Sequence, residues 1–186
     1  MKRVFFVTDV EATGPNFTTH SMYQFASVPV AQDGTVLENS FTSDVELVSN
    51  CYDTDTMDFL KKNLGVTPYT LSNRPNQVSA LEAIGQFEAF IEDTLKAVGA
   101  EKVIFVADNL AFDWGYINTY FHRFLGRNPF GYAGRNLPDI SMGLYGSRNK
   151  WEEFRTQEHT HDALDDVTGN AGALSHMIRN DGLVLT

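Results

Sequence analysis

Two short runs of β-branched and aromatic residues, separated by segments with helical spacing, constrain the fold of this chain most. Residues 3–10 read RVFFVTDV and residues 102–107 read KVIFVA, which is typical of buried strands. Between and after these runs, apolar residues recur at intervals of three and four, as in helices that cover one face of a sheet. We therefore expect an α/β fold with a mixed central sheet flanked by helices.

The remaining segments indicate how this sheet begins and which helices cover it. Runs 22–30 and 35–42 flank Gln32-Asp33-Gly34, and an Asp-Gly pair between extended segments predicts a hairpin, so the first three strands should form an antiparallel meander. Helical spacing predicts helices from Thr56, over 78–95, from about Asp113, and from about Asp162 to Ile178. The Gly- and Arg-rich residues 126–160 are predicted to be a loop region.

Chain length and composition indicate one compact unit. The 186 residues, 42% of them apolar, suit a single folded domain over residues 1–186. The apolar run after Met1, Lys2 and Arg3 is too short for a signal peptide, and no stretch approaches the roughly 18 apolar residues of a membrane span. The lone Cys51 has no partner for a disulfide or for a zinc site built on it. We expect a soluble, cytoplasmic protein that does not contact a membrane.

Charge is distributed unevenly along the chain. The net charge of −10 argues against binding of nucleic acid by bulk electrostatics. Residues 4–60 contain nine Asp and Glu and no Lys or Arg, whereas residues 123–155 contain six Lys and Arg against three acids. We interpret the basic stretch as a surface that contacts phosphates, with a solvated, ion-paired surface as the alternative.

Acidic residues follow both buried runs. Asp9 and Glu11 lie two apart at the end of a strand, so both point to the same face, where their repulsion calls for a hard cation such as Mg²⁺. Asp113 opens a helix six residues after the second run, a position that helix capping alone would also explain. Parallel neighbouring strands end at one edge of a sheet, so we expect Asp113 to meet Asp9 and Glu11.

A third polar cluster, HTHDALDD, occupies residues 159–166. Five residues along a helix rotate a side chain by roughly 500°, so His161 and Asp166 suit a loop that runs into a helix better than one helical face. Asp162 is predicted to be the N-cap, with Asp165 at the third helical position in a variant of the capping box. Asp166 is then free to face the site.

The three motifs occur in a family order. They are Asp9-Val10-Glu11-Ala12-Thr13-Gly14, Asn109-Leu110-Ala111-Phe112-Asp113, and His161 through Asp166. This set resembles the DnaQ-like, DEDDh-type 3′-to-5′ exonucleases of the ribonuclease H-like superfamily over most of the chain. The resemblance implies a ribonuclease H-like mixed sheet, with an antiparallel meander joined by parallel strands. Asp108 departs from the His or small residue common before the Asn, and Asp139 resembles a supporting family Asp.

The resemblance also implies roles for the site residues. Asp9, Glu11, Asp113 and Asp166 would hold two divalent metal ions, Mg²⁺ or Mn²⁺, and His161 would be the general base. Nucleic acid with a free 3′ end would be the partner, and nucleoside 5′-monophosphates the products. The residues expected to contact the terminal nucleotide are Thr13, Gly14, Phe17, Asn109 and Phe112.

Three other functions stay open at this point. One is an RNA-specific trimming or oligoribonuclease-like enzyme, and another is a metal-dependent phosphoesterase acting on small phosphates. The third is an inactive nucleic-acid-binding module of the same fold, against which the complete acid set and His161 count. The sequence leaves open whether the substrate is single- or double-stranded and whether the protein is a homodimer.

Overall fold

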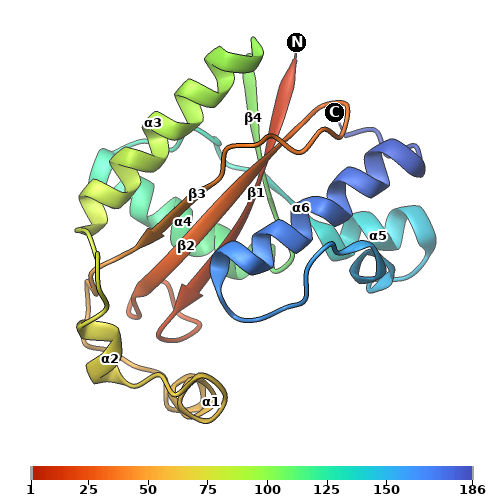
Figure 1. Cartoon of the computed structure of the whole chain (residues 1–186). Coiled ribbons are helices and arrows are strands. Elements are labelled where there is room, and N and C mark those ends of the chain that lie inside the picture. Colours follow the sequence, from red (N-terminus) through yellow and green to blue (C-terminus); the bar gives the residue numbers. More distant parts are fainter. Residues whose placement is uncertain (1, 186) are drawn as a thin grey trace.

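The computed structural model describes residues 2–185 and has a five-stranded sheet with helices on both faces (Figure 1). Among these residues, no helix is long and apolar enough to cross a membrane. The elements in chain order are β1 (Arg3–Ala12), β2 (Met22–Ala31), β3 (Phe41–Asp44), α1 (Thr54–Leu64), α2 (Pro68–Ser72), α3 (Ala80–Val98), β4 (Lys102–Ala107), α4 (Leu110–Leu125), β5 (Gly134–Asn136), α5 (Leu137–Tyr145), the 3₁₀ helix η1 (Lys150–Phe154) and α6 (Ala163–Asn180).

The sheet is mixed, with strand order β3-β2-β1-β4-β5. β2 is antiparallel to both β1 and β3, whereas β4 is parallel to β1 and to β5. Val7 of β1 lies beside Val106 of β4, so these two strands end at the same edge of the sheet. The predicted mixed α/β sheet with an antiparallel meander and parallel strands is therefore confirmed, and so is the shared edge.

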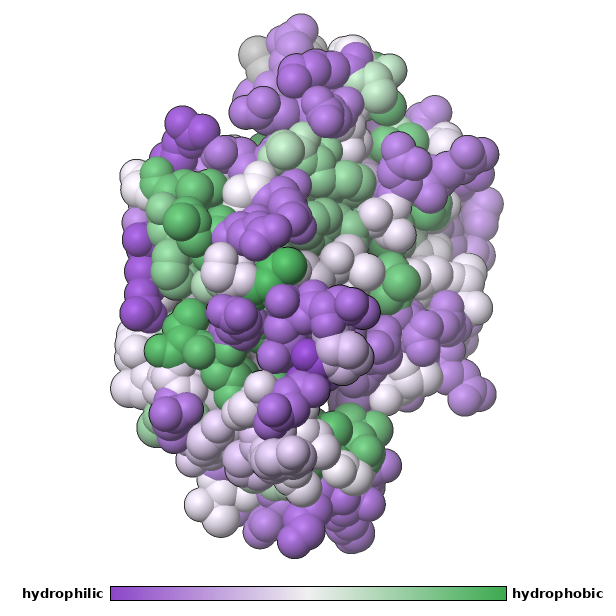
Figure 2. Space-filling model, turned by 60° about the vertical axis from the view of Figure 1, so that its left-hand side comes forward, coloured by the Kyte–Doolittle hydropathy of each residue, from purple (hydrophilic) through white to green (hydrophobic). Residues whose placement is uncertain are grey.

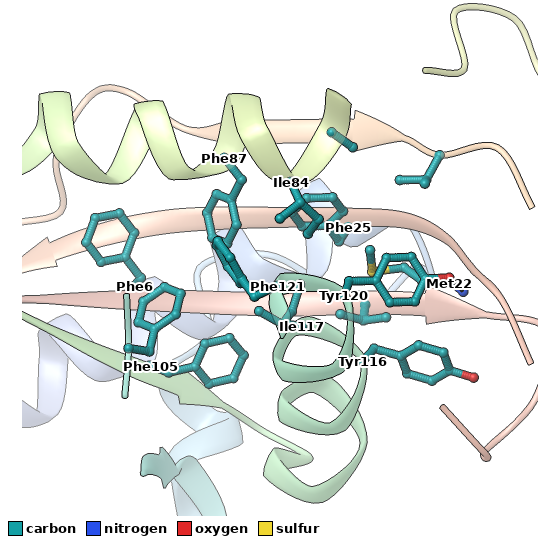
Figure 3. Close-up of a cluster of buried hydrophobic side chains, with 14 of the residues drawn as sticks. Phe6, Met22, Phe25, Ile84, Phe87, Phe105, Tyr116, Ile117, Tyr120 and Phe121 are labelled. Carbon is teal, nitrogen blue, oxygen red and sulfur yellow. Dashed lines mark hydrogen bonds between the residues drawn. The ribbon is translucent and has the colours of Figure 1, made fainter. Parts of the chain in front are cut away.

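Apolar side chains pack on both faces of the sheet. Helices α3 and α4 cover one face, where aromatic rings fill the space against the strands (Figure 3). Phe6, Phe87 and Phe121 are fully buried there, and each such ring contributes roughly 1.5–3 kcal/mol relative to an exposed one. Helices α5 and α6 cover the other face through residues such as Val167 and Leu174. The strand ends are thus held rigidly from both sides.

Helices α1 and α2 lie apart from these two layers, beyond one end of the sheet (Figure 1). A small cluster of Tyr23, Leu60 and Leu71 joins them to β2. The Asp53 side chain caps α1 by accepting from the backbone N–H of Thr56 at 2.9 Å. Helix α1 is consequently fixed next to the end of β1, where the motif acids lie.

The third strand is shorter than predicted, because it begins at Phe41 rather than at residue 35. The hairpin turn is present: Gly34 has a φ of +83°, and its N–H donates to the carbonyl of Ala31. After the turn, the N–H of Leu37 donates to the Pro29 carbonyl, but Pro29 has no N–H to donate in return. The ladder is interrupted at this proline, and regular pairing resumes four residues later.

The prediction of a loop over residues 126–160 was wrong, because this segment contains β5, α5 and η1. The inner side of α5 has helical spacing, with Leu137, Ile140 and Leu144 packed in the core that α5 shares with α6. Pro138 lies in the first turn of this helix. Neighbouring glycines and arginines conceal this short pattern. Helix α4 also begins earlier than predicted, at Leu110, because Asn109 rather than Asp113 occupies the N-cap.

Apolar residues at the surface are dispersed. On the face shown in Figure 2, hydrophobic residues form several separate groups interrupted by hydrophilic ones. Tyr69 and Tyr132 are the most exposed large aromatic residues described, on α2 and on the loop before β5. A dispersed arrangement of this kind is normal for a protein surface.

Candidate active site

Asp9 and Glu11 occupy the end of β1 and face helix α6. Side chains alternate along a strand, and Phe5 and Val7, which have the same parity, pack in the core under α6. Asp9 is only 7% exposed. The Tyr23 hydroxyl on neighbouring β2 donates to Glu11 Oε2 at 3.3 Å, which orients that carboxylate. The prediction that both acids share one face is confirmed.

Asp113 reaches the same edge from the first turns of α4. Its Oδ1 accepts the backbone N–H of Val10 at 3.0 Å, which holds the carboxylate against the β1 backbone between Asp9 and Glu11 in sequence. Its Oδ2 is buried and has no hydrogen-bond partner among residues 2–185. A buried carboxylate oxygen without a partner is costly in a folded protein. This atom therefore indicates a ligand that the protein atoms do not supply.

Asp166 approaches from the first turn of α6 and is fully buried. Asp162 is the N-cap as predicted, since it accepts the N–H of Leu164 at 3.1 Å. Gln24 of β2 ties this helix end to the sheet by donating to Asp162 and accepting the N–H of Ala163. Possible ligand atoms of Asp9, Glu11 and Asp166 lie within 4.8 Å of one another.

The predicted capping box is only half present. Asp165 does not return to the N-cap backbone; instead it accepts hydrogen bonds from the side chains of Gln157 at 2.6 Å and Thr160 at 3.1 Å. These bonds hold the loop that precedes α6. Asp166 completes this support by accepting the backbone N–H groups of Thr160 at 2.7 Å and His161 at 3.0 Å.

His161 lies in this loop with a φ of +61°, a left-handed conformation that is uncommon for a residue other than glycine. Its imidazole contacts the ring of Phe59 on α1 edge to face, with centroids 4.9 Å apart. The ring of His159 lies on another side, at 4.4 Å. Burial, followed by the charge of His159, lowers the pKa of His161, so this imidazole is neutral near neutral pH and can accept a proton.

Burial and repulsion raise the pKa values of three carboxyl groups. For Asp9 the larger cause is burial, and the charges of Asp113 and Glu11 add to it. Burial and the charge of Asp166 raise the pKa of Glu11 to about 8. Burial and then the charge of Asp108 raise the pKa of Asp113. A cation at this place would relieve the repulsion and lower all three pKa values.

This set of residues fits a hard divalent cation. The carboxylates of Asp9, Glu11 and Asp166 converge, and Asp113, with its unpartnered buried oxygen, lies near enough to raise the pKa of Asp9. All the ligand atoms that these residues offer are oxygens. Oxygen ligands suit Mg²⁺ and Mn²⁺.

A cleft of about 430 Å³ opens over Asp9, Glu11 and Asp113, whereas Asp166 is buried and does not line it. Three of the five expected substrate contacts line it, namely Gly14, Asn109 and Phe112. Thr13 does not, because its hydroxyl is buried and donates to the Cys51 carbonyl at 3.0 Å. Phe17 is also absent from the lining, since it packs on Tyr116.

Sequence reasoning missed several residues of the site. Phe59 lines the cleft and is 42% exposed. It lies outside the apolar stripe that Met57, Leu60 and Leu64 form on the same helix. A large aromatic residue outside the apolar stripe of a helix was the signal that could have revealed it. Tyr23 gave no such signal, because an aromatic residue in a buried strand is ordinary.

The basic stretch does not form one cationic surface. Asp139 is exposed and paired with Arg148, and neither residue lines the cleft. Ion pairs join Arg127 with Glu88, Arg148 with Asp139, Lys150 with Glu153 and Arg155 with Asp166. These pairs favour the alternative interpretation of an ion-paired surface.

Solved structures with the same fold are nucleases. No protein-family model matches the chain. The nuclease domain of 3′hExo, a DEDDh family member bound to rAMP, matches with a TM-score of 0.66 at 20% identity, over 98% of this chain and 94% of that one. Escherichia coli exonuclease I, in complex with a dT13 oligonucleotide, matches with a TM-score of 0.67 at 14% identity over 94% of this chain. The chain spans 41% of exonuclease I. The chain therefore shares its fold with the nuclease domain of 3′hExo and with this part of exonuclease I.

A relative is also recognisable by sequence. The 3′-5′ DNA exonuclease Cap18 of Escherichia coli is 29% identical over 177 residues, covering 89% of this chain and 87% of Cap18. This similarity agrees with the class predicted from the three motifs, a DnaQ-like, DEDDh-type 3′-to-5′ exonuclease.

Proposed function

We propose that this protein removes nucleoside 5′-monophosphates from the 3′ end of single-stranded DNA in a metal-dependent reaction, and that residues 1–186 form one exonuclease domain. The observation that carries the proposal is the convergence of Asp9, Glu11 and Asp166 with the unpartnered oxygen of Asp113, beside a neutral His161. Metal-dependent phosphodiester hydrolysis uses both features, a cation site and a proton acceptor.

The carboxylates and the histidine divide the chemistry between them. Asp9, Glu11, Asp113 and Asp166 would hold two divalent ions, Mg²⁺ or Mn²⁺, which when bound stabilise negative charge on the attacking and leaving oxygens of phosphoryl transfer. His161 accepts a proton from the attacking water. An O–P bond forms from this water as the bond from phosphorus to the 3′ oxygen breaks. The 3′ oxygen of the shortened strand takes a proton from solvent to become a hydroxyl group, and His161 releases its proton to solvent.

The cleft offers aromatic and backbone contacts to the terminal nucleotide. Phe112 and Phe59 both line it, and base stacking on aromatic rings tolerates every base. Gly14 also lines the cleft, and it lets this loop pack closely, because a Cβ there would lie 2.5 Å from the ring of His20. Thr13 and Phe17 fix the loop that contains Gly14: the Thr13 hydroxyl donates to the Cys51 carbonyl, and the Phe17 ring packs against Gly115.

DNA is the preferred substrate in this proposal. Cap18 is a DNA exonuclease, and exonuclease I has been solved in complex with single-stranded DNA. RNA is the second candidate, because the 3′hExo domain holds rAMP.

The test uses 5′-labelled oligonucleotides of one sequence as single- and double-stranded DNA and RNA, with Mg²⁺, Mn²⁺ or EDTA. We expect a ladder of shortened single-stranded DNA with either metal and none with EDTA. Blocking the 3′ end with an inverted nucleotide should prevent the ladder. Faster digestion of RNA would favour the second candidate, and cleavage of the blocked strand would contradict an exonuclease.

Matched variants test the site itself. Asp113→Asn should lower turnover by about three powers of ten or more, since it removes a charged ligand from a set that acts as a unit. Asp93→Asn is the control, because this acid lies on the exposed face of α3 in a weak ion pair with Lys96. Equal activity of the two variants would contradict the assignment of Asp113.

A further inference from the structure

Two histidines and one carboxylate meet at the loop that precedes α6. Possible ligand atoms of His159, His161 and Asp166 lie within 4.8 Å of one another. His159 stands outside the three sequence motifs, and no role has been assigned to it so far. Its side chain is 47% exposed, and it lines both the active-site cleft and a neighbouring cleft of about 650 Å³. A small ion can therefore reach it from solvent.

The loop conformation brings the two imidazoles together. Asp166 accepts the backbone N–H groups of Thr160 and His161, and this holds His161 in its left-handed conformation. The rings of His159 and His161 consequently meet edge to face, with centroids 4.4 Å apart. In an extended strand, by contrast, residues two apart would carry their side chains in parallel along one face.

The spacing of the ligand atoms suits a transition metal. His159 Nδ1 lies 3.0 Å from Asp166 Oδ2. Tetrahedral Zn²⁺ with bonds of about 2.0–2.1 Å separates neighbouring ligand atoms by about 3.3 Å. The ion would replace the hydrogen-bonded proton between the two atoms, and the neutral imidazole would carry its proton on Nε2 instead. Arg155 contacts the other oxygen of Asp166, Oδ1, at 3.5 Å, which leaves the Oδ2 side to the histidines.

The ligand types distinguish this site from the carboxylate site. Imidazole nitrogen suits Zn²⁺ and related ions, whereas Mg²⁺ prefers oxygen and dehydrates reluctantly. Asp9 and Glu11, which lie in reach of Asp166, lose their protons more easily beside a bound cation and so stabilise it at this corner.

We propose that His159, His161 and Asp166 form a Zn²⁺ site that inhibits the enzyme by occupying the general base. The inhibition rests on the proposed function, because it assumes that His161 is the proton acceptor. The binding of Zn²⁺ does not rest on it. A cell could thereby couple the enzyme to free Zn²⁺ without any change in Mg²⁺.

The test measures Zn²⁺ binding calorimetrically in an excess of Mg²⁺, which competes for Asp9, Glu11 and Asp113, the carboxylates that the proposed Zn²⁺ site does not use. The wild type should bind Zn²⁺. Loss of an outer-shell partner of a metal costs about 10- to 100-fold in affinity, and His159→Gln, which removes a direct ligand, should weaken Zn²⁺ binding at least as much. His122→Gln is the matched control, an exposed histidine on α4, and should bind as the wild type does. Equal affinities of the wild type and His159→Gln would overturn the proposal.

A second measurement needs no variant and no activity. In NMR spectra of the imidazole nitrogens, Zn²⁺ should shift the resonances of His159 and His161 and leave that of His122 in place. Shifts confined to other histidines would overturn the site. Hydrolysis of DNA is measured separately in Mg²⁺ alone: its absence would refute the proposed function, whereas normal hydrolysis that Zn²⁺ does not inhibit would refute only the inhibition.

Discussion

His161 is the residue on which the proposed chemistry depends most. His161→Ala should lower kcat by about two to four powers of ten, the usual contribution of a general base, with a smaller effect on KM. The backbone N–H that donates to Asp166 remains in this variant. His161→Asn tests the fold in parallel, since asparagine tolerates the left-handed conformation better than alanine.

Single-turnover rates of both His161 variants, measured beside thermal unfolding, decide this prediction. Two inactive but folded variants would support the assignment. The opposite pattern, a harmless His161→Ala with a damaging His159→Ala, would show that the wrong histidine was identified as the base.

Tyr23 acts on the site through Glu11. Its hydroxyl donates to that carboxylate at 3.3 Å, and the guanidinium of Arg74 lies over its ring at 5.3 Å. Tyr23→Phe keeps the buried ring but removes the hydrogen bond, whose loss costs about 0.5–1.5 kcal/mol for a neutral pair and more for a charged one. We expect about a three- to tenfold weaker apparent affinity for Mg²⁺, seen as a higher Mg²⁺ concentration at half-maximal rate. An unchanged Mg²⁺ titration would contradict the role of Tyr23 as a positioning residue.

At the scale of single residues, the sequence predicted the charged members of the site and missed their supports. Asp9, Glu11 and Asp113 could be placed because parallel strands end at one sheet edge, whatever the rest of the fold does. Phe59 and Tyr23 could not, because their roles depend on where α1 and β2 lie relative to β1. Thr13 was predicted to contact substrate, yet its hydroxyl is committed to the Cys51 carbonyl.

At the scale of elements, α1 forms a wall of the cleft, and its exposed aromatic residue should bind a base. Phe59→Ala should weaken binding of a single-stranded oligonucleotide by about 5- to 100-fold, since stacking on one ring contributes about 1–3 kcal/mol. Binding is measured by fluorescence anisotropy in the Asp113→Asn background, which prevents digestion. Tyr69→Ala is the control, because Tyr69 is 76% exposed on α2 and lies outside the cleft lining. If the two variants bind equally, α1 does not contact the substrate.

Sequence reasoning predicted best the bounds of those elements whose apolar residues form a clear run or a long periodic pattern. The strand over residues 102–107 has the predicted bounds, and the long helix α3 has clear three- and four-residue spacing. Helix α5 was missed because its nine residues lie among glycines and arginines. The length of the strand over 35–42 was overestimated, because Pro29 on the neighbouring strand lacks an N–H to pair with Leu37. The local sequence pattern of residues 35–42 does not reveal this missing hydrogen bond.

At the scale of the whole molecule, the buried acids make stability depend on pH and metal together. The pKa of Glu11 is raised to about 8, and those of Asp9 and Asp113 are also raised. In the unfolded chain such groups lose their protons near pH 4. Between about pH 4 and pH 8, the metal-free folded protein therefore holds more protons than the unfolded chain, so its free energy of unfolding falls as pH rises.

Thermal or urea unfolding in EDTA from pH 5 to pH 8 should show this decline, by up to about 1.4 kcal/mol per pH unit for each carboxyl group that differs. Mg²⁺ or Mn²⁺ should reverse the trend, because bound carboxylates are ionised and binding to the folded state alone stabilises it. The double variant Asp9→Asn, Asp113→Asn should have a flatter decline in EDTA and gain little from Mg²⁺. If the stability of the wild type in EDTA rises over this pH range, the pKa values of these carboxyl groups are not raised. The carboxyl groups would then not be crowded and unpaired, and the metal site inferred from them would be contradicted.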